Sequence, residues 1–86
     1  MAHRADNDFW EKYRALPIEV RSAARKNYLL LLANPRHPSL HFKKIRTKDL
    51  WSVRIGSYRA LAYAEGPDFI WFWIGPHDEY ERIICD

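Results

Sequence analysis

The chain has 86 residues and a formal net charge of +3, and 48% of its residues are apolar and 15% aromatic. This composition excludes a disordered chain and predicts one small domain, residues 1–86, with a single hydrophobic core. The lone cysteine, Cys85, excludes an internal disulfide. There is also no run of about 18 apolar residues and no signal-peptide core, so we expect a cytoplasmic protein that makes no membrane contact.

The first third of the chain predicts two helices. Residues 1–6 are compatible with a short edge strand or with a frayed end. Asn7 or Asp8 can cap a short helix that ends before Pro17, because the residue before a proline avoids the helical conformation. A second helix is expected over residues 17–33, and its inward positions are Ile18, Val20, Ala24, Tyr28, Leu31 and Leu32. Such a helical hairpin usually buries its apolar stripe, although an exposed stripe can also bind a partner.

A basic connection follows the second helix. Residues 35–40 form an irregular link with two prolines, and residues 41–45 are compatible with an edge strand. Residues 1–49 carry a formal charge of +6 and residues 50–86 carry −3, and no acidic residue lies between positions 34 and 48. This segment is either a solvated loop or a surface for phosphate groups. The residues assigned to RNA or phosphate binding are Lys43, Lys44, Arg46 and Lys48.

A tight hairpin is predicted next. Apolar residues alternate with polar ones over residues 50–55, as in a half-buried strand, and the Gly56-Ser57 pair forms a two-residue loop. A two-residue loop determines the register, which places Arg54 directly opposite Arg59 on one face of the sheet. Like charges in that position destabilise a sheet by a few tenths of a kcal/mol up to about 1 kcal/mol. A bound anion can offset this repulsion.

Two further strands and a short terminal element complete the expected fold. Strands are predicted at about 58–64 and 69–75, separated by the turn sequence EGPD, and residues 77–84 form a short helix or turn. The strand FIWFWI is apolar on both faces, so we place it deep in the sheet. The fold class is α+β, with an N-terminal helical hairpin packed on a three- to four-stranded antiparallel sheet.

Several kinds of active site are absent from the sequence. There is no glycine-rich phosphate loop, no nucleophile elbow and no HExxH motif. His37 and His41 lie four residues apart, but Pro38 disfavours a helical presentation and no cysteine pair accompanies them, so we expect no metal site. No cofactor is expected either.

The segment after the last strand supplies candidate acid–base groups. His77 can move a proton near neutral pH, and Tyr80 can donate a hydrogen bond or stack on a base. Together with Arg54 and Arg59, these groups suit metal-free RNA cleavage, in which the 2′-hydroxyl attacks the adjacent phosphorus. The alternatives are a surface or capping histidine, arginines paired with Asp78 or Glu79, and a tyrosine that seals the sheet edge.

Three sequence stretches carry a family resemblance that spans nearly the whole chain. NPRHPSLHFKKI, LWSVRIGSYRAL and FIWFWIGPHDEYERII resemble the RelE/ParE superfamily of bacterial type II toxins. The resemblance implies a ribonuclease-like toxin that a cognate antitoxin holds inactive. It also implies that the complex of the two proteins represses their operon. RelE-type members cleave mRNA in the ribosomal A site without metal, whereas ParE-type members poison DNA gyrase.

The same resemblance implies roles for individual residues. Arg59 matches the arginine that contacts the scissile phosphate, and Arg54 matches a basic strand position used for catalysis or phosphate binding. His77 matches the position of a catalytic histidine or arginine, and Tyr80 lies near an assisting aromatic residue. Ser52 departs from the pattern, because a lysine stands there in RelE enzymes.

The leading interpretation is a ribosome-dependent mRNA endoribonuclease with the catalytic residues His77, Arg59, Arg54 and Tyr80. Its expected partners are a cognate antitoxin, the ribosome and mRNA, with operator DNA bound only through the antitoxin complex. Two alternatives stay open: a gyrase inhibitor without nuclease activity, which the serine at position 52 favours, and an inactive co-repressor.

Overall fold

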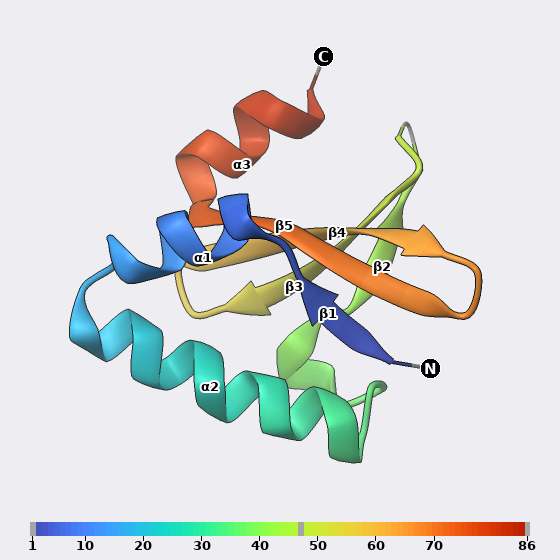
Figure 1. The fold of residues 1–86 in the computed structure, drawn as a ribbon, viewed down its shortest axis with the longest axis horizontal. Helices are drawn as coiled ribbons and strands as arrows, with labels where there is room; N and C mark the ends of the chain where they lie inside the picture. The colour runs from blue at the N-terminus through green and yellow to red at the C-terminus, as the bar shows by residue number, and fades with distance from the viewer. Residues whose placement is uncertain (1, 47, 86) are drawn as a thin grey trace.

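The computed structural model describes residues 2–46 and 48–85, which form helices on both sides of one sheet (Figure 1). The elements, in chain order, are β1 (His3–Ala5), α1 (Asn7–Arg14), α2 (Ile18–Ala33), the 3₁₀ turn η1 (Pro38–Leu40), β2 (Lys43–Ile45), β3 (Leu50–Ile55), β4 (Tyr58–Glu65), β5 (Asp68–Pro76) and α3 (His77–Ile84). The α+β class is confirmed. The strands of the hairpin and the terminal helix lie within one residue of their predicted bounds.

The sheet is larger than predicted and is mixed. Its strand order is β1-β5-β4-β3-β2, with β1 parallel to β5 and all other neighbours antiparallel. The prediction of three to four antiparallel strands is therefore wrong in strand number and in the direction of one strand. β5 lies second from one edge, and β4 is the central strand. Three residues are too few for a diagnostic apolar alternation in the sequence of β1, whose pairing depends on β5.

The helical hairpin forms as predicted, with small differences at its ends. Asp6 caps α1 instead of Asn7 or Asp8, because its side chain accepts a hydrogen bond of 2.9 Å from the backbone N–H of Phe9. Pro17 precedes the first residue of α2, and Asn34 follows the last one. The short loop between the helices places both of them on the same side of the sheet (Figure 1).

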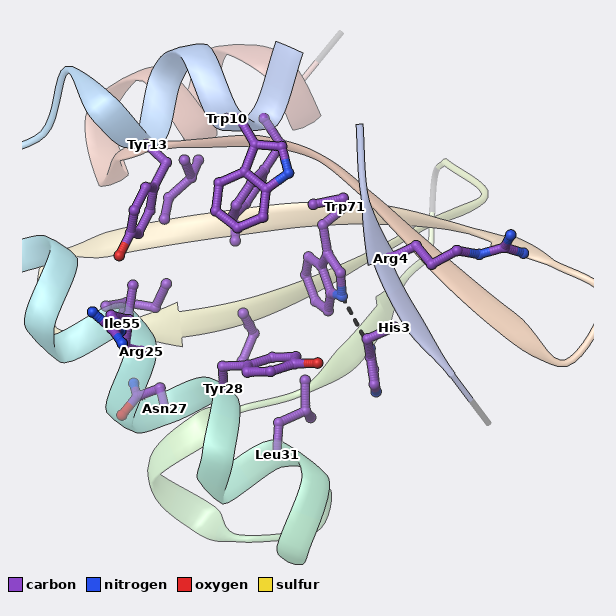
Figure 2. A pocket seen from close by; sticks show the side chains of 16 residues that line it. His3, Arg4, Trp10, Tyr13, Arg25, Asn27, Tyr28, Leu31, Ile55 and Trp71 are labelled. Carbon is purple, nitrogen blue, oxygen red and sulfur yellow. Dashed lines mark hydrogen bonds between the residues drawn. The ribbon is translucent and has the colours of Figure 1, made fainter. Parts of the chain in front are cut away.

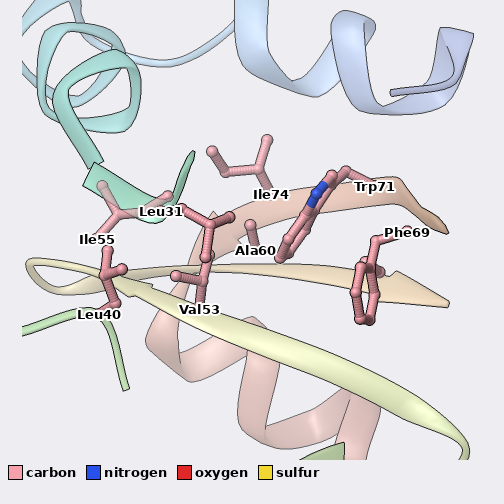
Figure 3. Packing of buried hydrophobic residues seen from close by; sticks show 9 residues of the cluster. Leu31, Leu40, Val53, Ile55, Ala60, Phe69, Trp71 and Ile74 are labelled. Atoms are coloured by element: carbon pink, nitrogen blue, oxygen red, sulfur yellow. The ribbon is translucent and has the colours of Figure 1, made fainter. Parts of the chain in front are cut away.

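Two hydrophobic clusters occupy opposite faces of the sheet. The larger one, shown in Figure 3, lies beneath α1 and α2 and includes Val53, Ala60 and Trp71. The smaller one lies beneath α3 and includes Leu61 and Trp73. A bulge lets β5 serve both clusters: Leu61 and Ala62 pair with Trp73 and Trp71, which leaves Phe72 as the extra residue. Because of this bulge, Trp71 and Trp73 enter opposite clusters although they are two residues apart.

The second helix buries much less than its apolar pattern predicts. Leu31 is its only buried residue within the described chain. Ile18, Tyr28 and Leu32 were expected to face inward but are 65%, 45% and 50% exposed, so these three predictions are wrong. α2 meets the sheet and its core through a stripe of mostly half-buried residues, Ala23, Ala24, Asn27, Leu30 and Leu31. The remaining apolar side chains border a pocket or face solvent.

Candidate active site

The β3–β4 hairpin sets the geometry of the candidate site. Gly56 has a φ of +59°, which a tight two-residue turn requires. The resulting register pairs Ile55 with Tyr58 and Arg54 with Arg59, as predicted. The two arginines therefore extend from directly opposed positions on the sheet face that α3 borders.

Arg59 is held in one orientation by its surroundings. Its Nη1 donates to the carbonyl oxygens of Gly56 and Tyr58, at 3.0 and 2.9 Å, and its Cζ lies 5.9 Å from the centre of the Tyr80 ring. The side chain is half-buried. A guanidinium fixed in this way is preorganised for a phosphate, because little side-chain entropy is lost when the anion binds.

Arg54 is more open to solvent. Its side chain is exposed, while its backbone carbonyl accepts a 2.9 Å hydrogen bond from Asn27 Nδ2 on α2. Across residues 2–46 and 48–85, no carboxylate forms an ion pair with Arg54 or Arg59. The alternative in which Asp78 or Glu79 neutralises these arginines is therefore not observed, and both guanidinium groups are available to a ligand.

His77 is the first residue of α3 and is tied to the same hairpin. Its backbone N–H donates to the carbonyl of Ser57 at 3.0 Å, and its ring centre lies 5.8 Å from that of Tyr80. His77 Nε2 donates to Glu81 Oε1 at 3.0 Å, one helical turn further on. The His77 side chain is 43% exposed, so solvent reaches the imidazole. His77 and Arg59 both lie next to the Tyr80 ring.

Glu81 is the functional neighbour that the sequence interpretation missed. Asp78 and Glu79, which follow His77 directly, were named only as possible partners of the arginines, and the carboxylate paired with His77 belongs to Glu81. The spacing of four residues within a helix is the signal that identifies Glu81, because such residues lie on one face. The carboxylate holds the proton on Nε2, which leaves Nδ1 as the proton-accepting nitrogen.

Tyr80 is placed differently from the expectation that it stacks on a base. It is 5% exposed, and its hydroxyl donates to Ser52 Oγ at 3.3 Å inside the α3 cluster. Stacking on a substrate base is therefore wrong for this conformation, because the ring is covered. Tyr80 instead seals the sheet beneath α3 and supports Arg59 and His77.

A close approach at Gly75 shapes the floor of the site. Gly75 pairs with Arg59 in the sheet. A Cβ atom at this position would lie 2.6 Å from Cζ2 of Trp73, which is closer than nonbonded carbon atoms approach. Glycine is needed here so that the Trp73 indole can lie along the strand.

The four cations assigned to phosphate binding do not share one surface. Lys43 pairs with Ser52, so strand alternation places it on the face of Arg54 and Arg59. Lys44 lies on the opposite face, and its Nζ forms a 3.1 Å ion pair with Asp49. Arg46 is exposed and Lys48 is half-buried beyond the end of β2. Lys43 is the member of this set that register brings to the site.

The histidines of the basic connection form no metal centre in the described ranges, which contain no cluster of three or more histidine, cysteine or carboxylate ligands. His37 Nδ1 accepts hydrogen bonds from the backbone N–H and the hydroxyl of Ser39, at 3.2 and 2.8 Å. His37 thereby caps η1. Across the same residues, every helix is too short or too polar to cross a bilayer.

Comparison with solved structures identifies the architecture. A chain of the RelB–RelE antitoxin–toxin complex from Methanococcus jannaschii matches with a TM-score of 0.73 and 15% identity, over 93% of this chain and 96% of that one. This chain has the RelE fold. The RelE–RelB complex from Pyrococcus horikoshii matches with a TM-score of 0.70 and 15% identity, over 88% and 93% of the two chains.

The isolated RelE toxin from E. coli also matches, with a TM-score of 0.65 and 18% identity over 96% of this chain and 94% of that one. No family model and no curated protein sequence matches the chain. The RelE fold therefore comes from the three-dimensional comparison, and it agrees with the resemblance seen in the three sequence stretches.

Proposed function

We propose that this chain is the toxin of a type II toxin–antitoxin system and that it inhibits translation by cutting mRNA on the ribosome in the cytoplasm. The observation that carries the proposal is the pair of opposed arginines beside a histidine on a RelE fold, and neither arginine forms an ion pair with a carboxylate among residues 2–46 and 48–85. Arginines at directly opposed positions of a sheet repel each other, and a phosphate bound to both would offset that repulsion.

A cognate antitoxin is the expected partner. Two of the matching structures are named as complexes of RelE with RelB, which supports a toxin–antitoxin pair for this chain. Operator DNA would be bound only by the complex of the two proteins. The ribosome and mRNA are the expected targets of the free toxin, and Lys43 adds positive charge on the side of the site where RNA would lie.

The proposed reaction uses the side chains already described. Nδ1 of His77 takes the proton from a 2′-hydroxyl, whose oxygen attacks the neighbouring phosphorus. As the new P–O2′ bond forms and the P–O5′ bond breaks, Arg59 and Arg54 stabilise the added negative charge. The 5′-oxygen leaves with a proton from water, and a 2′,3′-cyclic phosphate remains. Glu81 keeps the imidazole in the required tautomer, and Tyr80 supports Arg59.

Cleavage of mRNA by translating ribosomes with the purified chain tests the proposal. His77→Ala and Arg59→Ala should each lower the cleavage rate by about 10² or more, because each removes a proton-transfer or charge-stabilising group. Arg82→Ala, an exposed arginine on α3, is the matched control and should cleave normally. Circular dichroism shows whether each variant is folded. Unaltered cleavage and growth arrest in both site variants would reject the site.

The gyrase-inhibiting alternative is favoured by one observation. Ser52 stands at the position of the RelE lysine, is 2% exposed and is hydrogen-bonded by Tyr80, so it offers no group for proton transfer. Gyrase inhibition would produce DNA breaks and an SOS response without RNA cuts. An inactive co-repressor would not arrest growth when the chain is expressed without its antitoxin.

A further inference from the structure

An apolar pocket of about 370 Å³ lies between the helical hairpin and the sheet, on the sheet face opposite Arg54 and Arg59. Its volume is within the range of about 300–1,000 Å³ that is typical of small-molecule sites. The pocket exists because α2 buries only Leu31 and leaves the gap beside Ala24 unfilled. None of the residues assigned to catalysis lines it.

Five of the sixteen lining residues are phenylalanine, tyrosine or tryptophan. Figure 2 shows Trp10 and Tyr13 from α1, Tyr28 from α2 and Trp71 from β5 around the space. Trp10 and Tyr28 remain 43% and 45% exposed at its border, so the rings are available to a ligand. Flat π-surfaces at several orientations favour a planar aromatic guest, which can stack on one ring and meet the edge of another.

The charged residues at the pocket indicate whether its ligand is an anion or a cation. Its lining contains Arg4 and Arg25 but no aspartate or glutamate. Arg4 is already paired with Asp68 at 3.3 Å, whereas no ion pair in the described part of the chain involves Arg25. The aromatic faces could attract a cation, but the positive charge of Arg25 repels one, and Arg25 is the group that can bind an anion.

We propose that this pocket binds a small planar aromatic molecule that carries one anionic group, such as an aromatic carboxylate or sulfonate. The ring system lies between Trp10, Tyr28 and Trp71, and the anionic group is at the end of the pocket where Arg25 lies. The neighbouring Asn27 donates to the carbonyl of Arg54, so the helix that forms this wall also contacts the strand behind the candidate active site. Binding requires no nuclease activity and is tested separately from it.

The test is a titration of the purified full-length chain with naphthalene-2-sulfonate, and with neutral 2-naphthol for comparison. Calorimetry and backbone-amide NMR should show one site, with shifts at Ala24, Tyr28 and the Trp71 indole N–H. Ala24→Leu, which fills the gap, should weaken both probes by about tenfold or more through lost ring contacts. Ala33→Leu, on the exposed end of the same helix, is the matched control and should bind normally.

A second pair of variants tests the charge. Arg25→Gln should weaken the sulfonate several-fold and leave 2-naphthol unchanged, whereas Lys26→Gln on the exposed side of α2 should affect neither probe. If Ala24→Leu fails to fold by circular dichroism, Tyr28→Ala removes one wall and should weaken both probes. No binding at about 1 mM overturns the proposal. Shifts confined to Leu29 and Leu32, or self-association that closes the pocket in sedimentation, overturn it as well.

Discussion

At the scale of single residues, the guanidinium of Arg59 is the best-defined group of the candidate site. Two backbone carbonyls and the Tyr80 ring hold it, and all three belong to the hairpin or to α3. His77 depends on the same elements, because its backbone is bonded to Ser57 and its ring lies against Tyr80. The positions of both groups therefore follow from one turn and one buried tyrosine.

The role of Glu81 gives a prediction about the reaction. Glu81→Gln should lower the cleavage rate roughly tenfold, a part of the 10²- to 10⁴-fold that general acid–base catalysis typically contributes, because the carboxylate holds the imidazole in the required tautomer. Glu79→Gln, on the same helix but without a bond to His77, is the control. An unchanged rate in Glu81→Gln would show that the contact has no part in the reaction.

Individual residues also show where the sequence was informative about the site. The opposed arginines could be predicted because a two-residue loop leaves only one register. The buried position of Tyr80 could not be predicted with the same certainty, because it depends on how α3 packs over Ser52. Alternation separates Lys43 from Lys44, but only once β2 is known to be a strand paired with β3.

At the scale of elements, hydrophobic periodicity predicted β3, β4 and β5 well and predicted the short edge strands poorly. Strands of three residues, such as His3–Ala5 and Lys43–Ile45, contain too few positions for an alternating pattern. Their hydrogen bonds to long neighbours decide their conformation. The apolar stripe of α2 predicted more burial than the structure shows, because a periodic helix need not bury its whole stripe.

The edge strand β1 makes stability dependent on pH through His3. The Nδ1 of His3 accepts a 3.0 Å hydrogen bond from Trp71 Nε1, and its ring stacks on Phe69. Burial lowers the pKa of His3 below 6.5, although the Asp68 carboxylate opposes this shift. The unfolded chain therefore takes up the proton first, so His3 destabilises the fold as pH falls through about 6.5 toward the folded-state pKa.

Urea unfolding at pH 7.5 and pH 5.5 checks this prediction. His3→Asn, which retains an acceptor for Trp71 and cannot titrate, should lose less of its free energy of unfolding between these two pH values than the native chain loses. His41→Asn replaces an exposed histidine whose positive φ asparagine tolerates, and it should leave the native pH dependence in place. An equal loss in the native chain and in His3→Asn would contradict the assignment of the effect to β1.

At the scale of the whole molecule, the sheet separates two surfaces of different character. One face carries Arg54, Arg59 and Lys43 beside α3, and the other carries the aromatic pocket beneath the helical hairpin. Alternation along β3 and β4 creates this division, because Val53, Ile55 and Ala60 point away from the arginines. Three sequence stretches predicted the RelE fold. The pocket could not be predicted from the sequence, because it is a gap between elements and depends on how they pack.

The uneven placement of charge predicts how RNA binding responds to salt. Lys43→Gln should weaken RNA binding and reduce the slope of log affinity against log salt by about 0.7, the value for one contact with a single strand. Lys44→Gln should change the slope much less, because its side chain lies on the other face and is paired with Asp49. Filter binding of a short RNA at several salt concentrations measures both slopes. Equal slopes for the two variants would contradict the assignment of RNA to the arginine face.

The chemistry of the cut ends tests the central claim most directly. Sequencing of mRNA ends from cells expressing the chain, with separate capture of 2′,3′-cyclic phosphate ends, should reveal cuts in phase with codons. Those ends should disappear in Arg59→Ala and His77→Ala and persist in Arg82→Ala. Growth arrest with intact mRNA, or cuts that persist unchanged in both site variants, would contradict the assignment of RNA cleavage to the arginines and histidine of this sheet face.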